Sequence, residues 1–316
     1  MKIAILDDYA DAARRLADWD GLGEVTVFRD TVTGAALAER LRPFEVICLM
    51  RERTAVGADL IAALPHLRLI VTTGPRNASI DVAAARAAGI TVCGTQSRKT
   101  TTSELTTLLM LALNRRLMPE VAALHDTGWQ TGLGRDVAGL TLGLVGLGNI
   151  GAQMVTIGKA LGMGVIAWSP NLTDARCAEL GVGRMDSLPG LMARADVASV
   201  HMVLSDRTRG LVGRDAFAAA RAGQVFINTS RGSLVDTTAL LDGLRAGRPA
   251  MAGLDVFDVE PLPTDDPLRD ADLISSGRLL LTPHLGYTTE ATFRLFYTQT
   301  VEAIRAFQAG APIREL

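Results

Sequence analysis

Short apolar runs alternate with amphipathic stretches along the first hundred residues of the chain. The runs are KIAIL from Lys2, VTVF from Val25, EVICLM from Glu45, LRLIVTT from Leu67 and ITVCG from Ile90. The stretches between them, such as GAALAERLR, GADLIAALP and SIDVAAARAAG, have the composition and spacing of amphipathic helices. Unbroken apolar runs are typical of strands that are buried on both faces. This alternation predicts a parallel sheet with helices on both faces.

A second series of the same kind begins at Thr141. Its runs are TLGLVG from Thr141, GVIAWS from Gly164, DVASVHMV from Asp196, QVFINTS from Gln224, AMAGLDVF from Ala250 and LLLTPH from Leu279. Between the two series, one long helix is predicted from Thr100 to Thr127. Its apolar face runs through Leu105, Leu108, Leu109, Leu111, Ala112 and Leu113. A final helix is predicted over residues 290–309, so the chain is expected to form two successive α/β units.

Length and charge narrow the function classes. The 316 residues fit two domains, because domains usually contain about 100–200 residues. The net charge of −2 gives no basic surface for a nucleic acid or an anionic membrane. No apolar run reaches the roughly 18 residues of a membrane helix. The N-terminal MKIAILDDYA is interpreted as a first strand and not as a signal peptide, so a cytoplasmic protein is expected.

The cysteines and histidines do not suggest a disulfide framework or a metal site. Cys48 and Cys93 lie in apolar runs and are expected to be buried thiols, whereas Cys177 falls on a predicted helix. The number of cysteines is odd and no CxxC pair is present. The four histidines are far apart in sequence and lack the spacing of metal ligands, so no metal is predicted.

The segment 146–151, with the sequence GLGNIG, follows an apolar run and opens a helical pattern. In this context Gly146 permits a tight turn, Gly148 lets the backbone approach a pyrophosphate, and Gly151 lets the helix pack closely on the strand. The helix N-terminus offers free N–H groups to the phosphates. A tight turn without a ligand is the competing interpretation, and the strand before and the helix after the motif favour a dinucleotide site.

The end of the next strand bears on the choice between NAD and NADP. NAD-selective sites carry Asp or Glu about 20 residues after the glycines. Here the run Ala167 to Thr173 has no carboxylate, and Asp174 comes too late. Ser169 and Asn171, with Thr173, offer hydrogen-bond donors to a 2′-phosphate, and Arg176 is near in sequence. The alternatives are a site that accepts or prefers NADP and a neutral NAD site with weak discrimination.

Three later segments place polar residues at strand ends, where open α/β sheets bind their ligands. They are NTSRG from Asn228, DVFDVEP from Asp255 and TPHLG from Thr282. With the glycine motif before them, they make the chain resemble the D-isomer-specific 2-hydroxy acid dehydrogenase family, which includes glyoxylate and hydroxypyruvate reductases and phosphoglycerate dehydrogenases. The resemblance covers almost the whole chain. It implies that Arg231, Glu260 and His284 are the catalytic residues.

These residue types suit the chemistry. Reduction of a 2-oxo acid needs a hydride on carbon and a proton on oxygen, and His284 can give that proton or take it back. Glu260 beside it would favour the imidazolium. Arg231 has a planar fork that suits a carboxylate and a charge that polarises a carbonyl. Taken singly, each residue has a structural explanation as a surface ion pair, a loop residue or a backbone contact; their order and spacing favour catalysis.

Further roles follow from the resemblance. Thr229, Asp255 and Gly286 match cofactor-contacting positions, and Asn149 and Ile150 match backbone donors to the pyrophosphate. His201 matches a position that lines the cofactor cleft, with a satisfied buried histidine as the alternative.

The substrate side also has candidates, and it departs from the family pattern. Arg51 matches an arginine that reaches towards substrate, and Gly74 matches the loop that holds its carboxylate. In that loop, Pro75 removes a backbone donor and Arg76 adds a cation, which either binds a second acidic group or faces solvent. Tyr287 stands where the family commonly has a small residue, and it is expected to narrow the pocket or to contact substrate.

The resemblance implies two doubly wound parallel-sheet α/β domains. A flavodoxin-like substrate domain would comprise residues 1–97 and 288–316, and a Rossmann domain for NADP or NAD would comprise residues 98–287. The expected activity is hydride transfer between the nicotinamide cofactor and a small 2-oxo acid or D-2-hydroxy acid. The helix from Thr100 is expected to pair two subunits as a homodimer, or else to pack internally. The alternative function is that of a dinucleotide-binding corepressor that acts through protein partners.

Overall fold

The computed structural model describes all residues, 1–316, and contacts within the chain divide it into two compact units. Unit 1 comprises Met1–Arg98 and Thr288–Leu316, and unit 2 comprises Lys99–Tyr287. The limits inferred from the sequence differ from this division at one residue, Arg98.

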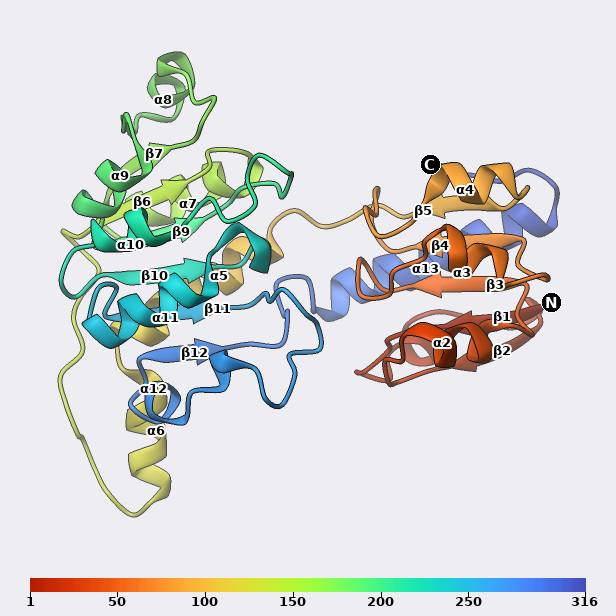
Figure 1. The fold of residues 1–316 in the computed structure, drawn as a ribbon, viewed down its shortest axis with the longest axis horizontal. Coiled ribbons are helices and arrows are strands. Elements are labelled where there is room, and N and C mark those ends of the chain that lie inside the picture. The colour runs from red at the N-terminus through yellow and green to blue at the C-terminus, as the bar shows by residue number, and fades with distance from the viewer. The chain divides into compact units, whose positions relative to one another are not determined.

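Unit 1 is a five-stranded parallel sheet with helices on both faces (Figure 1). Its strands are β1 Lys2–Ile5, β2 Glu24–Val27, β3 Val46–Leu49, β4 Leu69–Thr72 and β5 Thr91–Gly94. Its helices are α1 Ala13–Leu16, α2 Gly34–Leu41, α3 Ala58–Ala62, α4 Val82–Ala87 and α13 Glu290–Gln308. The strand order β2-β1-β3-β4-β5 is that of a flavodoxin-like sheet.

Local sequence signals account for the helices that cover the unit 1 sheet. The Asp81 side chain caps α4 by accepting a hydrogen bond from the Ala84 N–H at 2.9 Å. Helix α13 begins after Thr289, and its buried residues recur at the spacing of one helix face: Phe293, Phe296, Tyr297, Thr300, Val301 and Ile304. This face packs on β4 and β5, whereas side chains of α2, α3 and α4 join a separate apolar cluster.

Unit 2 is a seven-stranded parallel sheet. Its strands are β6 Thr141–Val145, β7 Gly164–Trp168, β8 Gly183–Arg184, β9 Val197–Val200, β10 Val225–Asn228, β11 Met251–Leu254 and β12 Leu279–Leu281. Its helices are α5 Thr101–Asn114, α6 Leu117–His125, α7 Asn149–Ala160, α8 Asp174–Leu180, α9 Leu188–Arg194, α10 Arg214–Ala218, α11 Thr237–Ala246 and α12 Ala271–Ser275, with short 3₁₀ helices at Gly232–Leu234 and Pro267–Arg269. The strand order β8-β7-β6-β9-β10-β11-β12 is that of a Rossmann sheet with one added strand, and it reverses between β6 and β9. The predicted fold class is confirmed.

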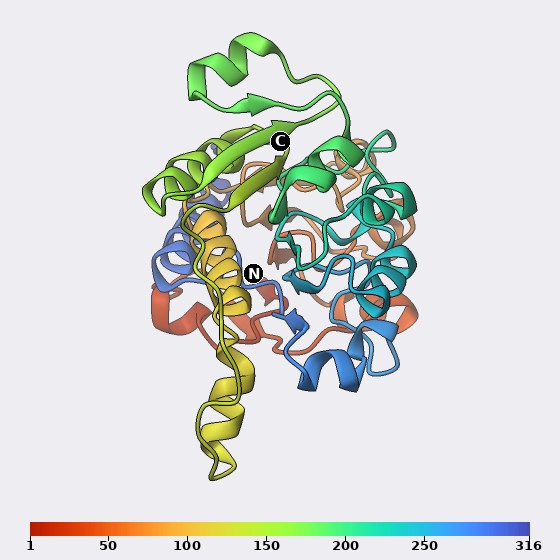
Figure 2. The ribbon, with the colours of Figure 1, turned by 90° about the vertical axis from the view of Figure 1, so that its left-hand side faces the viewer.

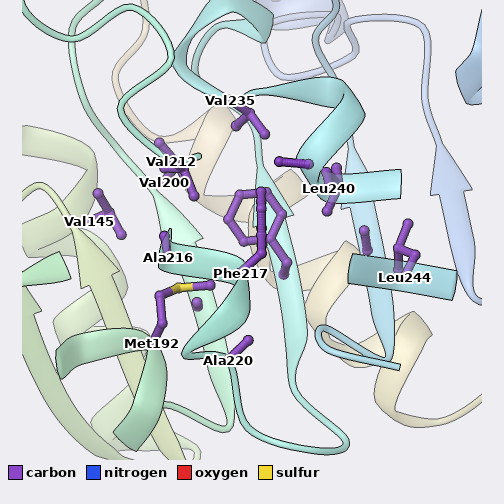
Figure 3. Close-up of a cluster of buried hydrophobic side chains, with 14 of the residues drawn as sticks. Val145, Met192, Val200, Val212, Ala216, Phe217, Ala220, Val235, Leu240 and Leu244 are labelled. Atoms are coloured by element: carbon purple, nitrogen blue, oxygen red, sulfur yellow. The ribbon is translucent and has the colours of Figure 1, made fainter. Parts of the chain in front are cut away.

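Two apolar cores sandwich the unit 2 sheet. On one face, residues of α9, α10 and α11 surround Phe217, which meets Phe226 edge to face with ring centroids 5.2 Å apart (Figure 3). On the other face, α5 and α7 pack over the sheet through residues such as Leu109 and Met154. Burial on both faces explains why the strands of this unit are unbroken apolar runs.

The prediction of a single helix from Thr100 to Thr127 is wrong. The structure has two helices, α5 and α6, because Arg116 adopts a left-handed conformation with φ 53° between them. Most of the predicted apolar face, including Leu109 and Leu113, belongs to the core of unit 2. Helix α6 buries none of its residues, and Figure 2 shows it in yellow below α5, away from the strands of its unit. The two-residue strand β8 was also not predicted.

The cysteines are placed as expected. Cys48, Cys93 and Cys177 are all buried free thiols, and Cys177 lies on α8. Burial raises the pKa of Cys48, and it raises the pKa of Cys93 to about 11. None of the helices combines the length and the apolar composition that a membrane span requires.

Candidate active site

The glycine motif forms the turn between β6 and α7, at the edge where the strand order reverses. Gly146 has φ 107°, and a Cβ atom there would lie 2.4 Å from the His201 carbonyl oxygen. A Cβ on Gly151 would lie 2.3 Å from the Gly146 carbonyl oxygen, so both positions require glycine. Around Gly148, by contrast, the space is open. This glycine precedes the N–H groups of Asn149 and Ile150 at the start of α7, so the turn leaves room for a phosphate at the helix N-terminus.

A pocket of about 790 Å³ opens beside this turn. Five of the predicted cofactor residues line it: Gly146, Gly148, Ser169, Asn171 and His201. Thr173 and Arg176, from the segment after β7, line it as well. The opposite wall is formed by the segment that follows β9, including Ser205, Arg207 and Thr208, which the sequence analysis missed. The signal for them in the sequence is the polar stretch SDRTR, residues 205–209, soon after the end of β9, which neighbours β6 at the reversal point.

His201 lines this pocket, and only one of its two ring nitrogens has a hydrogen-bond partner. Its Nε2 lies 2.9 Å from the Ser199 hydroxyl, whereas its Nδ1 is buried without a hydrogen-bond partner. Burial lowers the pKa of His201 to about 4, so the ring is neutral at pH 7. An unpartnered buried nitrogen in the pocket wall, together with the open space over Gly148, fits a polar dinucleotide bound here.

His284 and Glu260 are brought together by two loops of unit 2. The Nδ1 atom of His284 lies 2.6 Å from Glu260 Oε2, and Glu260 Oε1 accepts the Phe257 N–H at 2.9 Å. His284 has a left-handed backbone with φ 54°, and its N–H donates to the Thr282 carbonyl at 2.9 Å. Both groups are half-buried. The carboxylate thus fixes the ring through Nδ1 and leaves Nε2 as the nitrogen for proton transfer.

Asp255 supports the loop that carries His284. Its buried carboxylate accepts hydrogen bonds from the Thr282 hydroxyl at 2.6 Å, the Leu285 N–H at 2.6 Å and the Gly286 N–H at 2.8 Å. Burial raises the pKa of Asp255, and these hydrogen bonds act in the opposite direction. Both Asp255 and Gly286 were predicted to contact cofactor; here they contact each other, and their hydrogen bond helps to place His284.

Arg231 lies in the loop after β10. Asn228 braces this loop, because its amide nitrogen donates to the Arg231 carbonyl at 2.8 Å and its amide oxygen accepts the Ser230 N–H at 3.0 Å. The Arg231 guanidinium donates to the Ser230 carbonyl at 2.7 Å. A Cβ on Gly232 would lie 2.2 Å from the Phe257 carbonyl carbon, so the Arg231 loop packs backbone to backbone on the loop that leads to Glu260.

Two further predicted residues of unit 2 have clear neighbours. The Tyr287 ring meets the His284 ring edge to face, with centroids 5.1 Å apart. The buried Thr229 hydroxyl lies 2.8 Å from that of Thr106 on α5. Tyr287 is therefore beside the candidate acid, whereas Thr229 is not among the residues that line the 790 Å³ pocket.

The candidate substrate residues of unit 1 lie at the carboxyl ends of β3 and β4. Arg51 has φ 54°, and its N–H donates to the Thr73 hydroxyl at 2.8 Å. Its guanidinium fills the space beside Gly74, where a Cβ would lie 1.9 Å from Nη1. The buried Asn77 amide donates to the Arg51 carbonyl at 2.6 Å, a contact that the sequence analysis did not foresee. Arg76 is exposed.

The Gly74 N–H is already engaged. It donates to the Thr95 hydroxyl at 2.7 Å, so it does not serve as a free donor in a carboxylate cradle in this structure. The Arg51 guanidinium takes the place over this glycine. Unit 1 therefore presents a cation where the family pattern had suggested backbone donors.

Comparisons with known proteins identify the family. Residues 107–286 match the family described as D-isomer specific 2-hydroxyacid dehydrogenase, NAD binding domain. D-3-phosphoglycerate dehydrogenase of Mycobacterium leprae is 36% identical over 265 residues, which are 83% of this chain and 49% of that protein. Hydroxypyruvate reductase of Thermotoga maritima is 34% identical over 261 residues, which are 82% of this chain and 83% of that protein. A solved structure of phosphoglycerate oxidoreductase from Vibrio cholerae is 37% identical with a TM-score of 0.91, covering 98% of this chain and 100% of that one.

The fold and these matches define unit 2 as an NAD-binding Rossmann domain. The chain belongs to the D-isomer specific 2-hydroxyacid dehydrogenase family, which confirms the resemblance inferred from the sequence. The chain spans about half the length of the D-3-phosphoglycerate dehydrogenase of Mycobacterium leprae.

Proposed function

We propose that the protein transfers a hydride between a nicotinamide cofactor and a small 2-oxo acid or D-2-hydroxy acid. The observation that carries this proposal is the 2.6 Å contact between His284 and Glu260. It lies at the carboxyl edge of the same sheet whose glycine turn is shaped for a dinucleotide. A dinucleotide site alone would need no oriented histidine.

The residues divide the chemistry between them. When bound, the nicotinamide supplies or accepts the hydride at the substrate C2 carbon. In reduction, His284 gives a proton from Nε2 to the carbonyl oxygen, and in oxidation it takes the hydroxyl proton back. Glu260 holds the ring through Nδ1 and stabilises its protonated form. Arg231 binds the substrate carboxylate or polarises the carbonyl with its fixed charge.

For substrate, we propose a small 2-oxo acid, with glyoxylate and hydroxypyruvate as first trials. One relative is named hydroxypyruvate reductase and another is named D-3-phosphoglycerate dehydrogenase. Unit 1 acts as the substrate domain in this proposal. Arg51 is its carboxylate ligand beside Gly74, Arg76 offers a further charge, and Tyr287 of unit 2 limits substrate size.

For cofactor, the proposed site accepts NADP(H). Ser169 stands at the end of β7, where an acid would repel a 2′-phosphate, and it lines the cofactor pocket with Asn171. Asp174 is paired with Arg184 at 3.1 Å and does not line the pocket. The remaining predicted contacts, through Asn149, Ile150, Thr229, Asp255 and Gly286, are part of the same proposal.

We also propose that the protein is a homodimer. Leu117, Met118, Val121 and Leu124 of α6 are exposed, as are Leu108 of α5, Trp129 and Leu133. An apolar group of this size on one region of a unit is unusual for a monomer. A second copy of the chain is the proposed occupant, and a cytoplasmic location remains the expectation from the sequence.

Steady-state oxidation of NADPH and NADH against a panel of 2-oxo acids tests the proposed activity. Turnover with at least one acid, at a rate proportional to enzyme concentration, is the expected result. Tight binding of cofactor without turnover on any acid would contradict the proposal and would favour the corepressor alternative.

A further inference from the structure

The wall of the cofactor pocket that lies beyond the glycine turn is positively charged. Among the fifteen residues that line the pocket, the charged ones are Arg176 and Arg207, and neither Asp nor Glu is present. The two arginines come from different segments, since Arg176 is on α8 and Arg207 follows β9. Strands β7 and β9 flank β6 in the sheet, so these segments form opposite walls of the same pocket.

We propose that Arg207 is the residue that binds the 2′-phosphate of NADP(H) and thereby determines cofactor choice. This inference rests on the proposed dinucleotide-dependent function and adds a residue that the family pattern at the end of β7 does not supply. A phosphomonoester carries a charge of about −1.5 to −2 at pH 7 and has three acceptor oxygens. A guanidinium fork is well suited to bind it with two parallel hydrogen bonds.

Arg176 is the less suitable of the two arginines. Its Nη1 lies 2.7 Å from Glu179 Oε2, one turn along the same helix, so its charge is already balanced. Transfer of Arg176 to a phosphate would break this ion pair and leave the phosphate near the Glu179 carboxylate. Repulsion from that carboxylate would offset part of the attraction.

Arg207 has no such competitor. Its guanidinium forms no salt bridge, and its residue is exposed at the pocket wall. The segment that carries it is braced by Thr208, whose buried hydroxyl accepts the Ser205 N–H at 2.8 Å and donates to the Val203 carbonyl at 2.8 Å. The backbone beside Arg207 is therefore held in place while the side chain remains available for an anion.

Neutral donors complete the site. Ser169 and Asn171 line the same pocket. The Thr173 hydroxyl already accepts the Arg176 N–H at 3.2 Å, which leaves its own proton to donate. A cation opposite a cluster of hydroxyl and amide donors suits a phosphate better than it suits the ribose hydroxyls of NAD, which an acid would bind.

The test compares the dissociation constants of NADPH and NADH, measured by cofactor fluorescence with no substrate present. These two ligands differ only in the 2′-phosphate. The variant is Arg207→Gln, and the matched controls are Arg209→Gln, which is two residues along the chain and does not line the pocket, and Arg176→Gln. In the wild type NADPH should bind more tightly than NADH.

In Arg207→Gln, affinity for NADPH should fall roughly 10- to 100-fold, as expected for loss of a charge-assisted hydrogen bond, and affinity for NADH should stay within about twofold. Arg209→Gln should match the wild type, and Arg176→Gln should lose less NADPH affinity than Arg207→Gln.

Three results would overturn the inference: a preference for NADPH that survives Arg207→Gln, an equal loss of both affinities in that variant, or equal binding of both cofactors by the wild type. In each of these the dehydrogenase proposal stands, because a nicotinamide cofactor still binds. If neither cofactor binds the wild type, the proposed function fails as well.

Discussion

Ser169 follows β7 at the place where an NAD-selective Rossmann domain carries a carboxylate, and the pocket that it lines contains two arginines and no acid. His201, on the opposite side of the glycine turn, is a neutral histidine whose Nδ1 is buried without a partner. Single side chains of this kind decide which ligand the fold accepts, since many proteins share the sheet itself.

Ser169→Asp should turn the cofactor preference towards NADH. The new carboxylate would repel a 2′-phosphate and accept hydrogen bonds from the ribose hydroxyls of NADH. The ratio of kcat/KM for NADPH to kcat/KM for NADH should fall by roughly 10- to 100-fold, as expected when a favourable contact to a phosphate becomes a repulsive one. Ser169→Ala is the control and should change the ratio little. An unchanged ratio in Ser169→Asp would show that this position does not contact the ribose.

His201 should make the protein sensitive to acid. Burial lowers the pKa of His201 from 6.5 to about 4 in the folded chain. The unfolded chain therefore takes up a proton at this residue first, and the free energy of unfolding falls as the pH drops from about 6.5 towards 4. The loss is at most on the order of 3–4 kcal/mol.

His201→Gln removes this proton uptake, so urea unfolding at pH 7, 5 and 4 should give a flatter dependence on pH than in the wild type. The exposed His125→Gln should not flatten it. If the wild type and His201→Gln lose stability in parallel, the buried neutral histidine is not the cause.

Loops at strand ends position the proposed catalytic groups, Arg231, Glu260 and His284. The Arg231 loop after β10 and the loop after β11 touch through Gly232, where a Cβ would lie 2.2 Å from the Phe257 carbonyl carbon and 2.5 Å from the Asp258 nitrogen. Neither of these backbone atoms can yield as a flexible side chain would. The contact therefore fixes Arg231 in relation to the segment that ends at Glu260.

Gly232→Ala should separate these loops. We expect a loss of roughly 2–3 kcal/mol in stability, typical of overpacking, together with a fall in kcat. Gly164→Ala is the control, because a Cβ there meets nothing within 4 Å. Thermal unfolding and steady-state rates measure both effects. A Gly232→Ala variant with the stability and kcat of the control would show that the loops do not depend on this contact.

The sequence predicted most elements because local pattern determines them. Eleven of the twelve strands coincide with apolar runs, and the exception is the two-residue β8. The break between α5 and α6 could not be predicted, since its support is distant in sequence: the Arg135 guanidinium donates to the Asn114 amide oxygen at 2.6 Å, and the Arg135 N–H donates to the Asn114 carbonyl at 2.9 Å. The order of the sequence motifs likewise indicated Arg231, Glu260 and His284. The positions of Arg207 and Asn77 could not be predicted, because they depend on how the loops fold.

The exposed apolar side chains of α6 bear on whether two copies of the chain associate. Leu124 is 59% exposed and Trp129 is 73% exposed, although both are large apolar residues. Helix α6 contributes nothing to the core of its unit. A dimer that buries α6 would account for a helix whose own unit leaves it uncovered.

Leu124→Glu should therefore shift the protein from dimer to monomer in light scattering. A charge buried without a partner in an interface is strongly unfavourable. Ile313→Glu is the control at another exposed apolar residue, 36% exposed in unit 1, and should leave the mass unchanged. A wild type that is monomeric at micromolar concentration, or a Leu124→Glu variant that stays dimeric, would contradict the proposed interface.

In the proposed reaction His284, held by Glu260, transfers the proton that accompanies hydride transfer. This role is tested by the rate of cofactor oxidation with a 2-oxo acid in the wild type and in His284→Gln, together with the dissociation constant of the cofactor for each protein. In His284→Gln, we expect kcat to fall by roughly 10²- to 10⁴-fold, the usual contribution of a general acid, while cofactor affinity is retained. A His284→Gln variant with near wild-type turnover would contradict it, and so would a variant whose lost activity is explained by lost cofactor binding.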